Sequence, residues 1–190
     1  MKSGNTTREQ AVSVILFITL MLIYPETRPQ SPTVIPEIRS SPVEQTPLIR
    51  PPSRYEIMGM VLEEAERSTV PPYLALAVAK VESDFDADAL SSAGACGVMQ
   101  IMPRTGREEF GIARRDLWDA RLNIKVGIYF LARLHRQYGE QWNLALSHYN
   151  GGTLRGRGRY ATPHTYTRGY VRAVYRWWNY YKRSAAARRT

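Results

Sequence analysis

An apolar segment that ends in a glutamate is the feature that most constrains how this chain can fold. Residues 73–81 are almost all apolar and contain neither glycine nor proline, which favours a buried helix. Val78 precedes Glu82 by four residues, so the Glu82 carboxyl falls on the apolar stripe of this helix. A carboxyl that loses hydration has a raised pKa and can act as a general acid. The alternative is a surface glutamate on the last turn, the commoner case when periodicity alone is considered.

The residues after Glu82 predict a tight loop. Gly94 and Gly97 allow sharp turns, and the run Val-Met-Gln at 98–100 adds one polar side chain. Three aspartates alternate along the start of this loop: Asp84, Asp86 and Asp88. They lack the glycine and the distal glutamate of a calcium-binding loop, so we expect them to cap and solvate the turn.

Composition narrows the class of protein. Cys96 is the single cysteine among 190 residues, which excludes a disulfide-stapled domain, and it lies too far from the N-terminus to carry a lipoprotein anchor. The formal net charge is +9, with ten basic residues and no acidic one from Arg155 onward. Such a charge implies an acidic partner, which can be wall polymer, an anionic membrane surface or nucleic acid. The alternative is a solvated basic face without a dedicated partner.

The first part of the chain, residues 1–24, is predicted to be a signal peptide or membrane anchor. Its apolar run over 11–24 has 14 residues, fewer than the roughly 20 of a spanning helix, and suits the core of a signal peptide. No small-residue cleavage site follows, which favours an uncleaved anchor over a removed signal. Lys2 and Arg8 would keep the N-terminus in the cytoplasm.

The second part, residues 25–52, is predicted to be a proline-rich linker. It holds eight of the chain's twelve prolines and no aromatic residue, so it cannot build a hydrophobic core. In an extended polyproline geometry of about 3.1 Å per residue it would reach up to roughly 90 Å. We expect it to act as a hydrated tether.

The third part, residues 53–190, is predicted to be an all-α domain. Ser53 followed three residues later by Glu56 is a capping-box pattern, which places a helix start there. No stretch alternates apolar and polar residues long enough for a confident strand. Helical patterns follow one another from Ser53 to a break at 68–72, and then over 73–81, 105–111, 122–138, 142–149 and 165–184.

Three ordered blocks in this domain resemble the signature of the soluble-type lytic transglycosylases. The first is Glu-Ser at 82–83 with Ser-Ala-Gly-Ala-Cys-Gly-Val-Met-Gln-Ile-Met-Pro at 92–103. The others are Asn-Ile-Lys-Val-Gly-Ile-Tyr-Phe-Leu at 123–131 and Ala-Leu-Ser-His-Tyr-Asn-Gly-Gly at 145–152. The resemblance covers roughly residues 55–181. It implies a goose-type lysozyme-like fold and an enzyme that cuts the glycan strands of bacterial cell walls.

The resemblance assigns the catalytic role to Glu82. In this family one glutamate first protonates the glycosidic oxygen. It then takes the proton of the 6-hydroxyl of N-acetylmuramic acid, so that an intramolecular anhydro ring closes. Ring closure within the substrate gains from proximity and needs no second carboxyl to position a water molecule.

The resemblance also implies how the substrate is bound. Tyr149 matches a tyrosine whose hydroxyl faces the catalytic carboxyl, although its residue type alone favours a core aromatic. The other implied substrate-binding residues are the neighbour of Tyr149, two residues of the loop that lines the glycan cleft, and a serine that hydrogen-bonds near the acid. They are Asn150, Met99, Gln100 and Ser83.

Some positions depart from the family pattern. Cys96 stands where serine or another small residue is usual, and His148 stands where alanine is common. The segment 165–171 keeps Thr167, Tyr170 and Val171 of a Pro-Glu-Thr-x-x-Tyr-Val pattern but lacks its Pro and Glu. These departures affect the details of the cleft on that side and leave the reaction class unchanged.

Other candidate sites in the domain are weaker. The three histidines, His135, His148 and His164, lack the spacing of metal ligands, so we expect no metal and no cofactor. A group of C-terminal aromatic residues could stack on sugars, but their helical spacing favours core packing. They are Trp177, Trp178, Tyr180 and Tyr181.

The sequence therefore predicts a peptidoglycan lytic transglycosylase of the periplasm or cell envelope, anchored in the inner membrane or exported by a signal peptide. Its expected partner is the glycan strand, and a small enzyme of this type is expected to open the wall for a secretion, conjugation or phage-entry machine. No nucleic acid is expected, because such a partner would not need an export segment. The alternatives are a goose-type lysozyme and a non-catalytic peptidoglycan-binding module, and the retained Glu82, Gln100 and Tyr149 argue against the module.

Overall fold

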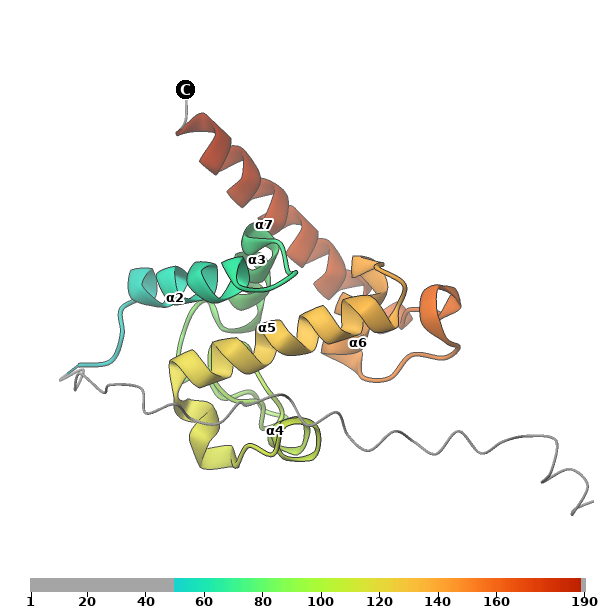
Figure 1. The fold of residues 1–190 in the computed structure, drawn as a ribbon, viewed down its shortest axis with the longest axis horizontal. Helices are drawn as coiled ribbons and strands as arrows, with labels where there is room; N and C mark the ends of the chain where they lie inside the picture. The colour runs from blue at the N-terminus through green and yellow to red at the C-terminus, as the bar shows by residue number, and fades with distance from the viewer. Residues whose placement is uncertain (1–49, 189–190) are drawn as a thin grey trace, which may run out of the picture. The chain divides into compact units, whose positions relative to one another are not determined.

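Helices make up nearly all the regular structure of residues 50–188, the part of the chain that the computed structural model describes (Figure 1). Its β-structure is limited to isolated bridges. The prediction of an all-α domain is thus confirmed. In chain order the elements are α2 (Arg54–Glu66), α3 (Pro72–Ser83), α4 (Pro103–Phe110), η1 (Arg114–Trp118), α5 (Ala120–Gln137), α6 (Trp142–Gly151), η2 (Gly158–Tyr160), η3 (Thr165–Thr167) and α7 (Arg168–Ala187).

The N-terminal predictions fall largely outside this part of the chain. The anchor over 1–24 and nearly all of the linker over 25–52 lie outside residues 50–188 and stay predictions. Among the helices that the structure describes, none is both long and apolar enough to span a bilayer.

Local sequence signals fix where the helices begin. Ser53 and Glu56 form the predicted capping box: the Ser53 hydroxyl accepts the Glu56 N–H at 3.4 Å, and the Glu56 carboxylate accepts the Ser53 N–H at 2.7 Å. Helix α4 begins at Pro103, two residues before its predicted start, because proline suits the first turn. Helix α5 also begins two residues early, because the Asp119 side chain caps it by accepting the Leu122 N–H at 2.8 Å.

Helix α3 is the centre of the larger hydrophobic core. Every residue over 74–79 is buried, so this helix is enclosed on all sides, as the apolar run predicts. It packs against α2 and α7. It ends where Asp84 and Phe85 take left-handed backbone conformations, with φ of 57° and 66°. Arg54 and Lys80 form ion pairs with Asp84 at this turn.

Helix α7 packs against α3 (Figure 1). Trp177, Trp178 and Tyr181 pack against the core, and the Lys80 ammonium lies 4.9 Å from the centre of the Trp177 ring. This confirms the core-packing interpretation for those three residues. Tyr180 differs, because half of it is exposed. A smaller hydrophobic cluster lies between α5 and α6 and includes Phe130, Leu134, Tyr138, Leu144 and Leu154.

Candidate active site

The carboxyl of Glu82 is held between α3 and α7. Glu82 is the penultimate residue of α3, and the Tyr170 hydroxyl on α7 donates a hydrogen bond to its Oε1 at 2.6 Å. Glu82 keeps partial exposure, so it remains accessible to a ligand. The sequence prediction of a carboxyl set among apolar neighbours at the end of a buried helix is therefore confirmed.

Burial controls the acidity of this carboxyl. Loss of hydration raises the pKa of Glu82 to about 7, and the hydrogen bond from Tyr170 opposes that rise. Because Tyr170 donates to Oε1, the carboxylate form keeps one hydrogen bond, and Oε2 is left to carry the proton in the acid form. A carboxyl with a pKa near neutrality can both donate and accept a proton in one reaction cycle.

The raised pKa predicts a pH-dependent stability. Glu82 binds its proton more tightly in the folded chain than in the unfolded chain, where its pKa has the ordinary value of 4.5. This tighter binding stabilises the folded state fully below pH 4.5, and the stabilisation is lost as pH rises through about 7. Relative to a Glu82→Gln variant, the wild-type protein should lose about 3 kcal/mol of unfolding free energy between about pH 4.5 and 8. Urea unfolding of both proteins across this range measures the difference. If the unfolding free energies of the two proteins change in parallel with pH, the Glu82 carboxyl is not buried.

Tyr149 lies on the other side of this site. It is near the C-terminal end of α6, and its hydroxyl donates to the Met99 carbonyl at 2.8 Å. The pKa of Tyr149 is raised, first by burial and then by the negative charge of Glu82. The hydrogen bond to the Glu82 carboxyl nevertheless comes from Tyr170. Tyr149 therefore ties α6 to the loop before α4.

Hydrogen bonds within the loop keep it next to the acid. The Ser83 hydroxyl donates to the Val98 carbonyl at 2.8 Å, so it ties the end of α3 to the loop and makes no hydrogen bond with Glu82. The Gln100 side-chain amide donates to the carbonyls of Ala89 and Gly97 at 3.0 and 2.9 Å. Both predicted residues thus hold the loop in shape, and any contact they make with a glycan stays a prediction.

Met99 is fixed by its surroundings. Its side chain is fully buried, and it lies so close to Gly127 on α5 that a Cβ there would meet the Met99 Cβ at 2.5 Å. The main chain of Met99 faces the site instead, because its carbonyl accepts the Tyr149 hydroxyl. Met99, which we expected to line the glycan cleft, is therefore a core residue, and its carbonyl is the part that contributes to the site.

Asn123 on α5 supports the loop, and sequence reasoning did not place it among the site residues. It is fully buried, with its Oδ1 accepting the Met99 N–H at 2.8 Å. Its Nδ2 donates to the carbonyls of Cys96 and Leu117, both at 2.9 Å. The sequence did carry one signal for this residue, because Asn123 begins the second family block at 123–131. Only the fold shows that this asparagine satisfies the loop backbone.

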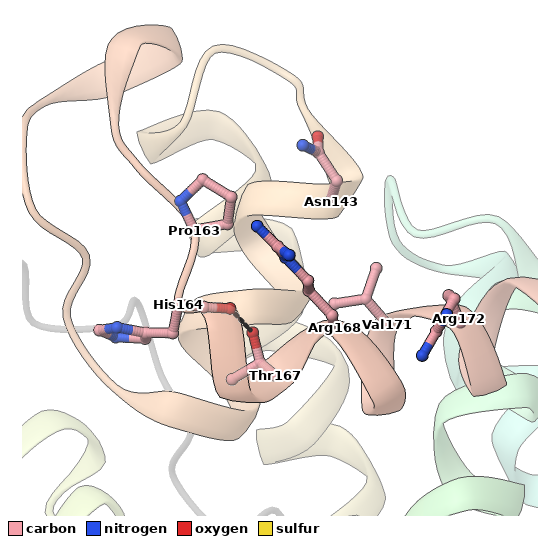
Figure 2. A pocket seen from close by; sticks show the side chains of 7 residues that line it. All are labelled: Asn143, Pro163, His164, Thr167, Arg168, Val171 and Arg172. Carbon is pink, nitrogen blue, oxygen red and sulfur yellow. Dashed lines mark hydrogen bonds between the residues drawn. The ribbon is translucent and has the colours of Figure 1, made fainter.

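A second network fixes the start of α7. Ser147 and Thr167 are buried with their hydroxyls 2.7 Å apart; Ser147 accepts the His164 N–H, and Thr167 donates to the His164 carbonyl. Figure 2 shows the Thr167 bond to His164. The Tyr166 hydroxyl donates to the Gly151 carbonyl at 2.9 Å. These bonds join the end of α6 to the start of α7, and thereby set the positions of both site tyrosines.

The remaining predicted positions divide between surface and core. Asn150 is exposed directly after Tyr149, where a ligand can reach it. His148 points into the smaller core, where its Nδ1 lies 2.7 Å from the Tyr138 hydroxyl and burial lowers its pKa. Cys96 is buried, and its thiol donates to the Gly94 carbonyl.

Over residues 50–188, no three His, Cys, Asp or Glu side chains group in a way that could hold a metal ion.

Known proteins share both the sequence blocks and the fold. The family described as "Transglycosylase SLT domain" matches residues 59–166. The chain is similar to membrane-bound lytic murein transglycosylase D of Escherichia coli K12, with 33% identity over 105 residues, 53% of this chain and 22% of that protein. It is also similar to the soluble lytic murein transglycosylase of the same strain, with 31% identity over 134 residues, 60% of this chain and 21% of that protein.

Solved structures agree with this placement. An inactive mutant of lytic transglycosylase Slt from Pseudomonas aeruginosa aligns with a TM-score of 0.58 and 27% identity over 68% of this chain and 24% of that one. The 70-kDa soluble lytic transglycosylase in complex with bulgecin A has the same fold, with a TM-score of 0.57 at 24% identity, over 67% of this chain and 24% of that one. The predicted lysozyme-like helical fold is confirmed, and the chain spans about a quarter or less of these larger proteins. Since the family match covers more than half of its residues, the chain belongs to the transglycosylase SLT domain family.

Proposed function

We propose that this protein is a peptidoglycan lytic transglycosylase that cleaves the β-1,4 bond between N-acetylmuramic acid and N-acetylglucosamine. The observation that carries the proposal is the Glu82 carboxyl, whose burial raises its pKa to about 7 on a residue that keeps partial exposure. Burial raises that pKa, the Tyr170 hydrogen bond opposes the rise, and no second carboxyl contributes to the shift. A site with one carboxyl of this acidity suits a reaction whose nucleophile belongs to the substrate.

The first step of the proposed reaction needs Glu82 as an acid. Its proton passes from Oε2 to the glycosidic oxygen while the bond from that oxygen to C1 of the muramic acid residue breaks. The carboxylate that forms keeps the hydrogen bond from Tyr170, which stabilises its charge in a site with little water.

The second step reverses the role of Glu82. The carboxylate takes the proton of the 6-hydroxyl, whose oxygen bonds to C1 and closes the 1,6-anhydro ring. Glu82 is thereby returned to its acid form, and no water molecule enters the product. We propose that Asn150 and the loop residue Gln100 orient the sugar. The buried Met99, together with Ser83 and Tyr149, would keep that loop against the acid.

The similar proteins support this reaction class. The two Escherichia coli relatives are named lytic murein transglycosylases. The structural neighbour from Pseudomonas aeruginosa is an inactive mutant in which a glutamate is replaced by glutamine. The proposal is tested by adding the purified protein to a suspension of purified peptidoglycan. A fall in turbidity is expected, and a suspension that stays turbid would contradict the proposal.

The predicted location is part of the proposal. Residues 1–24 would hold the protein at the inner membrane or export it, and the linker would let the domain reach the wall, where it opens gaps for a secretion, conjugation or phage-entry machine. Cell fractionation tests this location. A mature species without its first ~30 residues in the soluble periplasmic fraction would indicate a removed signal in place of an anchor.

The pH dependence of wall cleavage follows from the same carboxyl. Because the acid step needs protonated Glu82, kcat/KM should fall as pH rises above about 7. A Tyr170→Phe variant lacks the hydrogen bond that lowers the Glu82 pKa, so its alkaline limb should move to higher pH. Rates of clearing across pH measure both limbs. An unchanged alkaline limb in Tyr170→Phe would show that Tyr170 does not act on the acid.

A further inference from the structure

The outer face of α7 carries a row of arginines. Because each residue turns a helix by about 100°, residues four and seven apart share a face, and the members of this row fall within an arc of about 80°. The arc lies opposite Val174, which is fully buried. All members are exposed, and we call them the arginine stripe: Arg168, Arg172, Arg176 and Arg183.

The arginine stripe is long and straight. From Arg168 to Arg183 it runs for about 22 Å, at a rise of about 1.5 Å per residue. Figure 1 shows the C-terminal half of α7 extending past the ends of the neighbouring helices. The stripe thus follows a protruding helix, and a flat partner could contact it along most of its length.

The charge of the stripe is not compensated by the domain. Arg67 on α2 pairs with Glu63, and Arg104 on α4 pairs with Glu108. Helix α7 contains no acidic residue, and the four arginines of the stripe form no ion pair with any carboxylate of residues 50–188. Like charges four residues apart on a helix repel one another, so an external anionic partner would relieve this repulsion.

Aromatic side chains border the stripe. Tyr180 is half exposed one turn after Arg176. Tyr175 is partly exposed, and its ring centre lies 5.7 Å from that of Trp178. The Lys182 ammonium lies 4.8 Å from the centre of the Trp178 ring and adds a cation at this margin. Tyrosine and tryptophan beside basic residues are typical of helices that lie at a membrane–water interface.

We propose that the arginine stripe docks this domain on an anionic phospholipid surface. Guanidinium groups donate several hydrogen bonds to phosphate oxygens, and a straight row of them matches a plane of headgroups. Proteins that bind a single strand of nucleic acid hold it in a basic groove, whereas the stripe follows a protruding helix. Tyr170 lies on the opposite face of α7, so docking would leave Glu82 free, and the inference does not rest on the reaction proposed above.

A contact-range fluorescence assay on the full-length chain tests this surface. Asn179→Cys places a thiol-reactive fluorophore on the outer face of α7, and the buried Cys96 stays unlabelled. Vesicles of phosphatidylcholine, alone or mixed with phosphatidylglycerol in equal parts, carry a nitroxide on some headgroups, which quenches the fluorophore only at contact. Quenching is expected with the anionic vesicles at low salt, and it should be lost at high salt or with neutral vesicles. Attachment through residues 1–24 alone does not bring α7 into contact.

Two variants with the same loss of charge show whether the stripe is responsible. The stripe variant combines Arg172→Gln, Arg176→Gln and Arg183→Gln, and the lipid concentration for half-maximal quenching should rise on the order of 100-fold. The matched control changes three exposed basic residues of η1 and α5 that form no ion pair within residues 50–188, and it should quench like the parent. Its changes are Arg114→Gln, Lys125→Gln and Arg136→Gln.

Three results would overturn the lipid-docking surface. Equal quenching by neutral and anionic vesicles would show that charge does not direct the contact. Equal losses in the stripe variant and the matched control would indicate a diffuse basic surface. Absence of quenching, together with retention on a DNA oligonucleotide or on purified wall polymer that only the stripe variant loses, would assign the stripe to that partner instead.

Discussion

A Glu82→Gln variant should fold normally and lose wall-clearing activity on the order of 100- to 10,000-fold, the usual contribution of general acid–base catalysis. Glutamine keeps the shape of the side chain and can still accept the Tyr170 hydrogen bond, so the packing between α3 and α7 is retained. It cannot give up a proton to the glycosidic oxygen. Initial rates of turbidity loss, at matched protein concentration and about pH 6, measure the effect.

The matched control for this prediction is Asp88→Asn. Asp88 is an exposed carboxylate of the loop that follows Glu82, and the change removes the same charge from the same region of the chain. Its activity should stay within about twofold of wild type, since exposed substitutions away from a site have small effects. Near-wild-type clearing by a folded Glu82→Gln protein would refute the assignment of the acid. Equal losses in both variants would indicate a general effect of charge.

An Asn123→Ala variant should lose on the order of 4 kcal/mol of unfolding free energy. The change removes three buried hydrogen bonds, to the Met99 N–H and to the carbonyls of Cys96 and Leu117. The Cys96 carbonyl would keep its bond from the Ile101 N–H, but the Met99 N–H would lose the partner that Asn123 supplies. A buried donor left without a partner costs more than the net value of a hydrogen bond. Urea denaturation monitored by circular dichroism gives the free energy of unfolding directly.

The matched control here is Asn179→Ala, which makes the same substitution at an exposed position of α7. It should change stability by less than about 0.5 kcal/mol. Asn123→Ala should also lower activity at temperatures where the protein remains folded, because the Met99 carbonyl that receives Tyr149 would lose its support. An Asn123→Ala protein as stable as Asn179→Ala would mean that the loop does not depend on this side chain.

The sequence predicted the position of the acid because that position depends on local pattern. An uninterrupted apolar run specifies a buried helix, and the spacing from Val78 to Glu82 puts the carboxyl on its inner side. Helix starts were equally local where a cap marks them, as Ser53 shows. The observed helix start lies two residues before the predicted one where the capping residue, such as Asp119, precedes the apolar pattern.

The contacts of the acid could not be read from local pattern, because they join distant parts of the chain. Tyr170 lies 88 residues after Glu82, and its place in the pattern at 165–171 did not indicate a contact with that carboxyl. Met99 and Ser83 have roles that depend on which backbone groups the folded loop leaves to be satisfied. Asn123 is similar, since nothing in a polar residue on a helical face indicates that it will be fully buried.

In the proposed reaction, Glu82 serves as acid and then as base while the substrate supplies the nucleophile. Mass spectrometry of the muropeptides released from purified peptidoglycan distinguishes this reaction from hydrolysis. We expect products that are lighter by one water molecule than those of a lysozyme and that resist borohydride reduction at the cut end. Reducible products that have gained water would contradict it, assign the protein to the hydrolases, and require a second carboxylate near Glu82 to hold that water.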